Sequence, residues 1–164
     1  TNNSVATGFA AGNTHFSQWR LTTDFTGNAD PIASNLEEVD APLGFGVLGS
    51  SMTEASGIFT FPSTGYWEIT AFALSVASSL TTSRASLYIY TTTNNATYAI
   101  ASIGGGATYY ATSTGTCSYI MDVADVTQCK VRFRVSQVET SVPTQGDTAQ
   151  NETYFTFNRL ADRP

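Results

Sequence analysis

The sequence predicts an all-β protein, a two-sheet antiparallel sandwich or jelly roll, and three observations support this. Residues that favour strands (Thr, Tyr, Phe, Val and Ile) are abundant and helix formers are scarce. Short segments in which apolar and polar residues alternate recur about every ten residues along the chain. No segment has the apolar period of an amphipathic helix. The 164 residues are 41% hydrophobic and 12% aromatic, enough for one sizeable core, so we expect a single domain over residues 15–164.

The N-terminal third of the chain shows the weakest pattern. Residues 1–14 are small and polar, which is typical of a flexible connector. The segment 15–21 (HFSQWRL) predicts a first strand. Residues 22–57 are rich in Gly, Asp, Asn and Pro, which indicates short strands and turns. Pro31 and Pro42 in this region argue against central-strand positions.

The pattern is sharpest between residues 57 and 76. A strand at 58–61 runs into the turn Pro62–Gly65, and a long strand follows at 66–76. Period two places Trp67, Ile69, Ala71 and Ala73 on one face of that strand, and Tyr66, Glu68, Thr70, Phe72 and Leu74 on the other. Both faces carry large apolar groups, so both should be covered. One face would meet the second sheet, and we expect a partner subunit on the other.

Further strands are predicted along the rest of the chain. The run Gly104–Gly106 lacks the Lys-Ser/Thr of a phosphate-binding loop, so we interpret it as a hairpin tip that ends a strand. In 130–138 and 154–160, Val and Phe alternate with polar residues. The expected strands are 85–91, 98–103, 109–112, 117–123, 130–138 and 154–160.

Charge and hydropathy exclude several partners. The formal net charge is −6, and Lys130 is the only Lys among seven basic residues. Without a basic patch, the sequence excludes nucleic-acid binding through phosphate neutralisation and disfavours anionic membrane surfaces. No apolar run is long enough to span a bilayer, so we expect no membrane insertion. No basic segment followed by an apolar one opens the sequence, so we expect no signal peptide.

The sequence offers little for catalysis, and we expect no enzyme activity. His15 is the only His, and no G-x-S-x-G motif accompanies it. One His and two Cys cannot supply a zinc site. Acidic residues cluster at Glu37-Glu38-Asp40, but a tuned carboxylate pair is not evident. Glu68 lies inside an apolar strand, and a pairing with Arg132 or Arg134 across strands or subunits would explain it.

Metal and cysteine chemistry stay open at this level. Asp122 and Asp125 fall in a predicted turn and Asp147 in a predicted loop, positions where Ca²⁺ ligands occur, although no EF-hand pattern exists. We therefore assign no metal and no cofactor. Cys117 and Cys129 are either bridged or two buried thiols.

One segment resembles a known family. The run GIFTFPSTGYWEI, residues 57–69, resembles the "G-x-F-x-x-P-x-x-G-x-Y-x-F" signature that joins two central strands in C1q/TNF-like jelly rolls. Trp67 stands where that family usually has Tyr, and Ile69 where it usually has Phe. Phe155-Thr156-Phe157 resembles the closing strand of the fold, and Phe16-Ser17 before Trp19 resembles its first strand.

The resemblance implies a ten-stranded jelly roll that assembles as a homotrimer. It places Trp67 and Ile69 in the core and turns the other face of the strand toward neighbouring subunits. The candidate trimer-interface residues are Tyr66, Glu68, Phe72, Leu74 and Tyr154. The chain has no collagen-like stalk, and it lacks the basic surface that some members use for charged ligands.

The segments RLTTDFTGNADPIASNLE (20–37) and SGIFTFPSTGYW (56–67) are most similar to sequences of fibre modules of marine bacteriophages. We therefore expect a non-enzymatic trimeric knob on the virion exterior, or otherwise an extracellular protein. Its partners would be itself, other virion proteins and a host-surface glycan or protein. A capsid decoration module without a receptor and a secreted C1q/TNF-like ligand remain alternatives. Candidate ligand-binding residues in the expected loops 91–97, 104–110 and 142–151 are Asn94, Asn95, Tyr109, Tyr110, Gln145 and Asp147.

Overall fold

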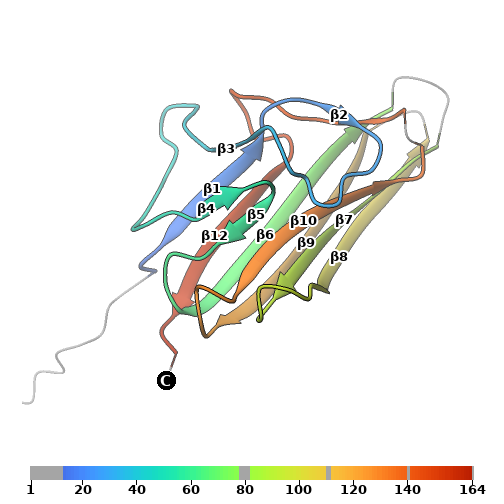
Figure 1. Ribbon diagram of the computed structural model, residues 1–164. Helices are drawn as coiled ribbons and strands as arrows, with labels where there is room; N and C mark the ends of the chain where they lie inside the picture. Colours follow the sequence, from blue (N-terminus) through green and yellow to red (C-terminus); the bar gives the residue numbers. More distant parts are fainter. Residues whose placement is uncertain (1–12, 78–81, 110–111, 140, 164) are drawn as a thin grey trace, which may run out of the picture.

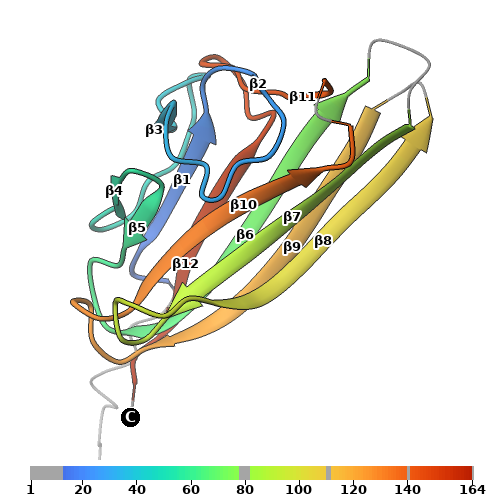
Figure 2. The same ribbon diagram turned by 45° about the vertical axis from the view of Figure 1, so that its right-hand side comes forward.

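The protein is a sandwich of two antiparallel sheets (Figures 1 and 2). The computed structural model describes residues 13–77, 82–109, 112–139 and 141–163, so the expected connector at 1–14 lies almost entirely outside the described residues. Within these ranges, sheet A has seven strands and sheet B has five. No helix in the described part of the chain is long and apolar enough to cross a membrane.

Sheet A is built around the long strand β6. In order across the sheet, β2, β11, β6, β12, β1 and β3 are neighbours, and β9 pairs with the other side of β6. The strands are β1 (Phe16–Leu21), β2 (Phe25–Thr26), β3 (Leu36–Glu38), β6 (Gly65–Val76), β9 (Thr112–Val123), β11 (Pro143–Thr144) and β12 (Tyr154–Ala161).

Sheet B lies against sheet A and follows the order β4, β5, β10, β7, β8. Its strands are β4 (Thr53–Ala55), β5 (Ile58–Thr60), β7 (Thr82–Thr92), β8 (Ala99–Tyr109) and β10 (Lys130–Gln137). The connection from β5 to β6, which carries the family-like signature, therefore crosses from one sheet to the other.

The core lies between the two sheets and is rich in aromatic rings. Phe133 of sheet B stacks on Phe155 of sheet A, with ring centres 3.8 Å apart and planes 4° apart. Phe59 packs edge-on against Phe133 at 5.5 Å. Trp67 and Ile69 are fully buried. The predicted alternation is confirmed, because the odd-numbered residues of β6 are buried and the even-numbered ones are partly exposed.

The edge between β8 and β9 corrects one prediction. Gly104–Gly106 form no hairpin tip but lie inside β8, paired with β7. A side chain at Gly104 would clash with the carbonyl oxygen of Thr116 on β9, so glycine permits the two edge strands to approach. The separate strand expected at 109–112 is also wrong, since Tyr109 ends β8 and Thr112 begins β9.

The region 22–57 matches its prediction of short strands and turns. Pro31 and Pro42 lie outside strands, as expected, and each follows a cis peptide bond. The segment before β3 is tied to β10, because Ala29 and Val135 exchange two backbone hydrogen bonds of 3.0 Å. This long loop therefore lies beside sheet B although both neighbouring strands, β2 and β3, belong to sheet A.

Candidate functional site

The five residues expected at a subunit interface share one surface, the outer face of sheet A, which we call the assembly face. Tyr66, Glu68, Phe72 and Leu74 alternate along β6 and all are partly exposed. Tyr154 on β12 lies opposite Phe72, and their rings stack with centres 5.3 Å apart. The fold thus brings these residues together, as period two and the antiparallel register require.

Glu68 lies in the assembly face without the partners expected for it. Its neighbours across the ladder are Asn158 on β12 and Ile120 on β9. The expected pairing with Arg132 or Arg134 is wrong within the chain, because both arginines lie on the outer face of sheet B. The core between the two sheets separates the two outer faces.

A loop with exposed apolar side chains lies at the β1 edge of sheet A. The residue Leu48 pairs with Phe16 at the start of β1 through two hydrogen bonds of 2.9 Å. Phe45 lies between Gly44 and Gly46, which have no side chains to cover it. The exposed fractions are 99% for Leu43, 45% for Phe45, 43% for Val47 and 47% for Leu48.

A buried arginine holds the start of this loop in place. Arg20 is fully buried and donates to the Glu37 carboxylate at 2.8 Å, the Asp40 carboxylate at 2.7 Å and the Ala41 carbonyl at 2.7 Å. These bonds fasten residues 37–41 to β1. The acidic cluster seen in the sequence therefore has a structural partner, which the sequence did not reveal.

The opposite edge of the sandwich carries a second set of exposed apolar residues. Ile120 on β9 is 57% exposed and Ile103 on β8 is 56% exposed. Ile100 and Tyr119 are also exposed at this edge. Sheet A therefore has uncovered apolar groups at both of its edges, near β1 and near β9, with the assembly face between them.

The predicted ligand residues are divided between the two ends of the sandwich. The Asn94 side chain accepts hydrogen bonds from the backbone of Ala96 (3.1 Å) and Thr97 (2.9 Å), so it shapes its own turn. Asn95 is exposed and has a positive φ of 51°. This turn follows β7 at the end where Thr92 pairs with Lys130.

Gln145 and Asp147 lie at the other end. The Gln145 backbone donates to Leu74 at 2.8 Å, and the Asp147 carboxylate accepts from the Ala149 backbone at 2.6 Å. Tyr109 is the last residue of β8 rather than part of a loop, and Tyr110 lies outside the described residues. The structure therefore does not gather the six residues into one site.

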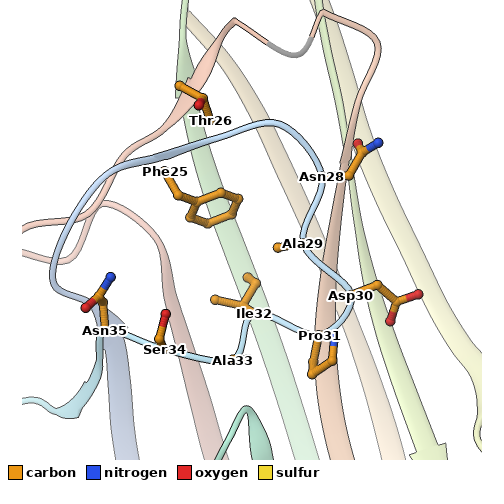
Figure 3. A pocket seen from close by; sticks show the side chains of 10 residues that line it. All are labelled: Phe25, Thr26, Asn28, Ala29, Asp30, Pro31, Ile32, Ala33, Ser34 and Asn35. Carbon is orange, nitrogen blue, oxygen red and sulfur yellow. The ribbon is translucent and has the colours of Figure 1, made fainter.

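A cavity of about 400 Å³ opens inside the loop between β2 and β3. Figure 3 shows Phe25, Ala29 and Ile32 pointing into it, while the Asp30 carboxylate points away across β10. Among the ten lining residues Asp30 is the one ionisable group, so the cavity brings together no acid–base pair.

The outer face of sheet B holds a cluster that the sequence analysis missed. Arg132 and Arg134 on β10 lie opposite Tyr90 and Tyr88 on β7. The guanidinium of Arg132 lies 5.1 Å from the ring centre of Tyr90 and 4.6 Å from that of Tyr98. The Arg134 guanidinium lies 4.9 Å from the Tyr88 ring and donates to the Tyr90 hydroxyl at 3.2 Å. We call these five residues the arginine–tyrosine strip.

The candidate calcium ligands do not converge. Asp122 lies in β9 rather than in a turn and binds Arg163 at 2.5 Å. Asp125 accepts hydrogen bonds from the Thr127 hydroxyl and backbone, both 2.7 Å, and these hold its pKa below the usual value. Within the described ranges no three His, Cys, Asp or Glu residues form a metal-binding group.

The two cysteines are free and buried, which decides between the alternatives that the sequence left open. Burial raises the pKa of the Cys117 thiol to about 11. His15 precedes β1, with its ring 5.7 Å from that of Trp67 and its Nδ1 3.0 Å from the Thr14 hydroxyl. This is a structural environment and not a triad.

Comparison with solved structures identifies the architecture. Murine APRIL superposes with a TM-score of 0.62 over 89% of this chain and 98% of that chain, at 7% identity. Eiger TNF from S. frugiperda gives a TM-score of 0.60 over 93% and 96%, at 10% identity. The fold is the TNF-like jelly roll. The prediction of a two-sheet jelly roll of this class is therefore confirmed.

The sequence comparisons add no closer relative. No protein-family model matches the chain, and no curated protein sequence matches it significantly. At 7–10% identity the structural similarity shows the fold alone.

Proposed function

We propose that this chain is a non-enzymatic module of a virion, a trimeric knob on a fibre or spike that attaches to a host-surface glycan or protein. The observation that carries the proposal is the assembly face, where Phe72, Leu74 and Tyr154 stay partly exposed in a TNF-like jelly roll. The similarity of two sequence segments to phage fibre modules supports the virion as its location.

The distribution of exposed apolar groups supports a closed ring of subunits. The loop carrying Leu43 and Phe45 lies at the β1 edge, and Ile103 and Ile120 lie at the β8–β9 edge. Two different apolar surfaces on opposite edges suit a head-to-tail contact, in which one edge of each subunit packs on the next. Such heterologous contacts close into a cyclic oligomer when the rotation permits. The TNF-like fold favours three copies.

The oligomeric state is the first test. Light scattering over a dilution series should give a stable mass about three times the 17.5 kDa of the chain. Phe72→Glu should abolish assembly, because it places a charge in the centre of the assembly face. Thr93→Glu is the matched control, since Thr93 is exposed in the turn after β7. A wild-type monomer would refute the trimeric knob.

Attachment is tested separately with intact cells. The labelled trimer should bind marine bacterial cells, and loss of binding after periodate or after protease treatment distinguishes a glycan from a protein receptor. The absence of binding to any cell in a broad panel would favour the capsid decoration module.

The TNF-like fold itself favours one further candidate, a secreted recognition ligand. Binding to cultured animal cells, with no binding to bacteria, would support that candidate instead.

A further inference from the structure

The arginine–tyrosine strip gathers positive charge on an acidic chain. The other basic residues are committed elsewhere: Arg20 and Lys130 are buried, Arg159 lies 2.5 Å from Asp162, and Arg163 lies 2.5 Å from Asp122. Arg132 and Arg134, together with the exposed Arg84 farther along β7, share the outer face of sheet B. Among the described residues the structure gives them one ion-pairing carboxylate, Asp30.

The contacts made by Asp30 are loose. Its oxygens lie 3.5 Å from Arg132 and 3.7 Å from Arg134, longer than a charge-assisted hydrogen bond of about 2.7–2.9 Å. The guanidinium edges of both arginines therefore keep donor capacity for another carboxylate. Among the residues that the structure describes, Arg132 Nε and the Tyr98 hydroxyl are buried without a hydrogen-bond partner, so the outward-facing donors are the terminal nitrogens of the guanidinium groups. Burial raises the pKa of the Tyr98 phenol, and its ring lies 4.6 Å from the Arg132 guanidinium.

A hollow adjoins the strip on the same face. It has a volume of about 290 Å³ and is lined by Arg84, Ala85, Ser86, Gly105, Gly106 and Ala107. Gly105, which pairs with Ser86, has no side chain to fill it. The lining is mostly backbone, a hydroxyl and a guanidinium, a polar surface that suits a hydroxylated ligand rather than an apolar one.

The strip and the hollow form one elongated surface. Tyr90 and Arg84 are six residues apart on β7, which corresponds to about 20 Å at roughly 3.3 Å per residue. Guanidinium groups occur along this length with tyrosine rings between them, and Ile100 and Ile103 of β8 lie exposed beside the rings. The excess positive charge is modest, so widely spaced carboxylates match it better than a dense array of sulfates.

We propose that the outer face of sheet B, from the arginine–tyrosine strip to the Arg84 hollow, binds an extended polysaccharide whose sugars carry carboxylates, a polyuronate. This inference rests on the proposed attachment function and names its ligand class. Arg132, Arg134 and Arg84 receive the carboxylates as paired donors. Ser86 meets the sugar hydroxyls, the Tyr98 ring supports the Arg132 guanidinium, and ligand carboxylates displace Asp30 from its long contacts.

The test is titration calorimetry of the full chain with a galacturonic acid oligomer. Wild-type protein should bind it with an affinity that falls as salt increases. Arg134→Gln and Arg84→Gln should each weaken binding about tenfold, because each removes a charge-assisted donor pair. Arg163→Gln is the matched control, since it makes the same charge change at the Asp122 pair and should leave binding unchanged.

Asp30→Asn gives the sharpest discrimination. Removing the competing carboxylate should tighten polyuronate binding severalfold, whereas a purely structural ion pair predicts no gain. Unaltered or weaker binding by Asp30→Asn would count against the proposal.

Other polymers identify a different ligand class. Neutral dextran should not bind. Equal or tighter binding of dextran sulfate would overturn the commitment to carboxylates, and equal binding of polyglutamate would indicate an acidic protein instead. If no saccharide binds while the trimer forms and attaches to cells, this inference fails and the proposed function stands.

Discussion

The outer faces of the two sheets differ in how their aromatic side chains are satisfied. On sheet A, Phe72 and Tyr154 stack on each other, and an unpaired aromatic-apolar patch remains. On sheet B, Tyr88 and Tyr90 lie against arginine side chains of the same chain. The guanidinium groups lie over the rings, while Ile100 and Ile103 of β8, opposite Tyr90 and Tyr88, stay exposed at the edge of this face. The aromatic rings of the two outer faces therefore lie in different surroundings: ring against ring on sheet A, and ring against guanidinium on sheet B.

The largest expected effect is on the mass of the assembly, when one tyrosine on each face is replaced by glutamate. In the proposed trimer, Tyr154→Glu should convert the assembly to monomers, with dissociation more than about 100-fold easier, because the carboxylate would enter the centre of the proposed interface. Tyr88→Glu makes the same chemical change on sheet B and should leave the mass unchanged. Sedimentation of both variants at matched concentrations decides, and equal behaviour of the two would remove the distinction between the faces.

The second prediction concerns the Arg20 clamp, the set of hydrogen bonds from Arg20 to residues 37–41 beside the assembly face. Arg20→Met should lower the free energy of unfolding by about 2–3 kcal/mol, because three hydrogen bonds to a fully buried guanidinium are lost. Arg163→Met, which removes an exposed pair, should change it by less than about 0.5 kcal/mol. Urea unfolding of both variants measures the difference. An unchanged free energy of unfolding in Arg20→Met would show that residues 37–41 keep their place without these hydrogen bonds.

The third prediction concerns the seam where β8 and β9 approach, beneath the edge of the assembly face. The Cys117 thiol has a pKa raised from 9.0 to about 11 by burial. A raised pKa in the folded state means that the neutral thiol contributes stability below pH 9 and that this contribution is lost as the pH rises toward 11.

Stability should therefore fall by about 2 kcal/mol more between those pH values in the wild type than in Cys117→Ala. Unfolding curves at each pH give the difference between the two proteins, which isolates Cys117 from other titrating groups. Thiol reagents at neutral pH should label neither cysteine until denaturant is added. Parallel stability curves for the two proteins would show that the seam is open to water.

The smallest effect on stability is expected on the outer face of sheet B. Arg132→Met should cost about 1 kcal/mol or less, because cation–π and ion-pair contacts on a partly exposed surface contribute little. Thermal unfolding measures it. A loss comparable to that of Arg20→Met would mean that the strip holds sheet B together and is no independent surface.

Local patterning in the sequence predicted much of the fold. Period two in β6 assigned the faces of Trp67 and Phe72 correctly, because one sheet face is buried whatever the topology. The strand containing Gly104 was misjudged, since glycine is common in turns and only the neighbouring backbone of β9 explains it inside a strand.

The sites depended on contacts that local patterns do not encode. The Arg20 clamp joins residues separated by 17 to 21 positions through an irregular loop. The arginine–tyrosine strip requires the register that sets Arg134 of β10 against Tyr88 of β7. Alternation alone showed that Arg132 and Arg134 share a face, but it did not show which aromatic rings would lie beside them.

The pairing of β1 with β12 determines how this domain responds to a pulling force. The backbone N–H of Arg159 donates to the His15 carbonyl at 3.0 Å, so the chain enters and leaves the sandwich at the same pole (Figure 1). A load applied between these two ends opens the antiparallel ladder one hydrogen bond at a time, starting from that rung. A load between these ends and the opposite pole would act along the strands, so we expect the domain to resist it better than tension between its own ends.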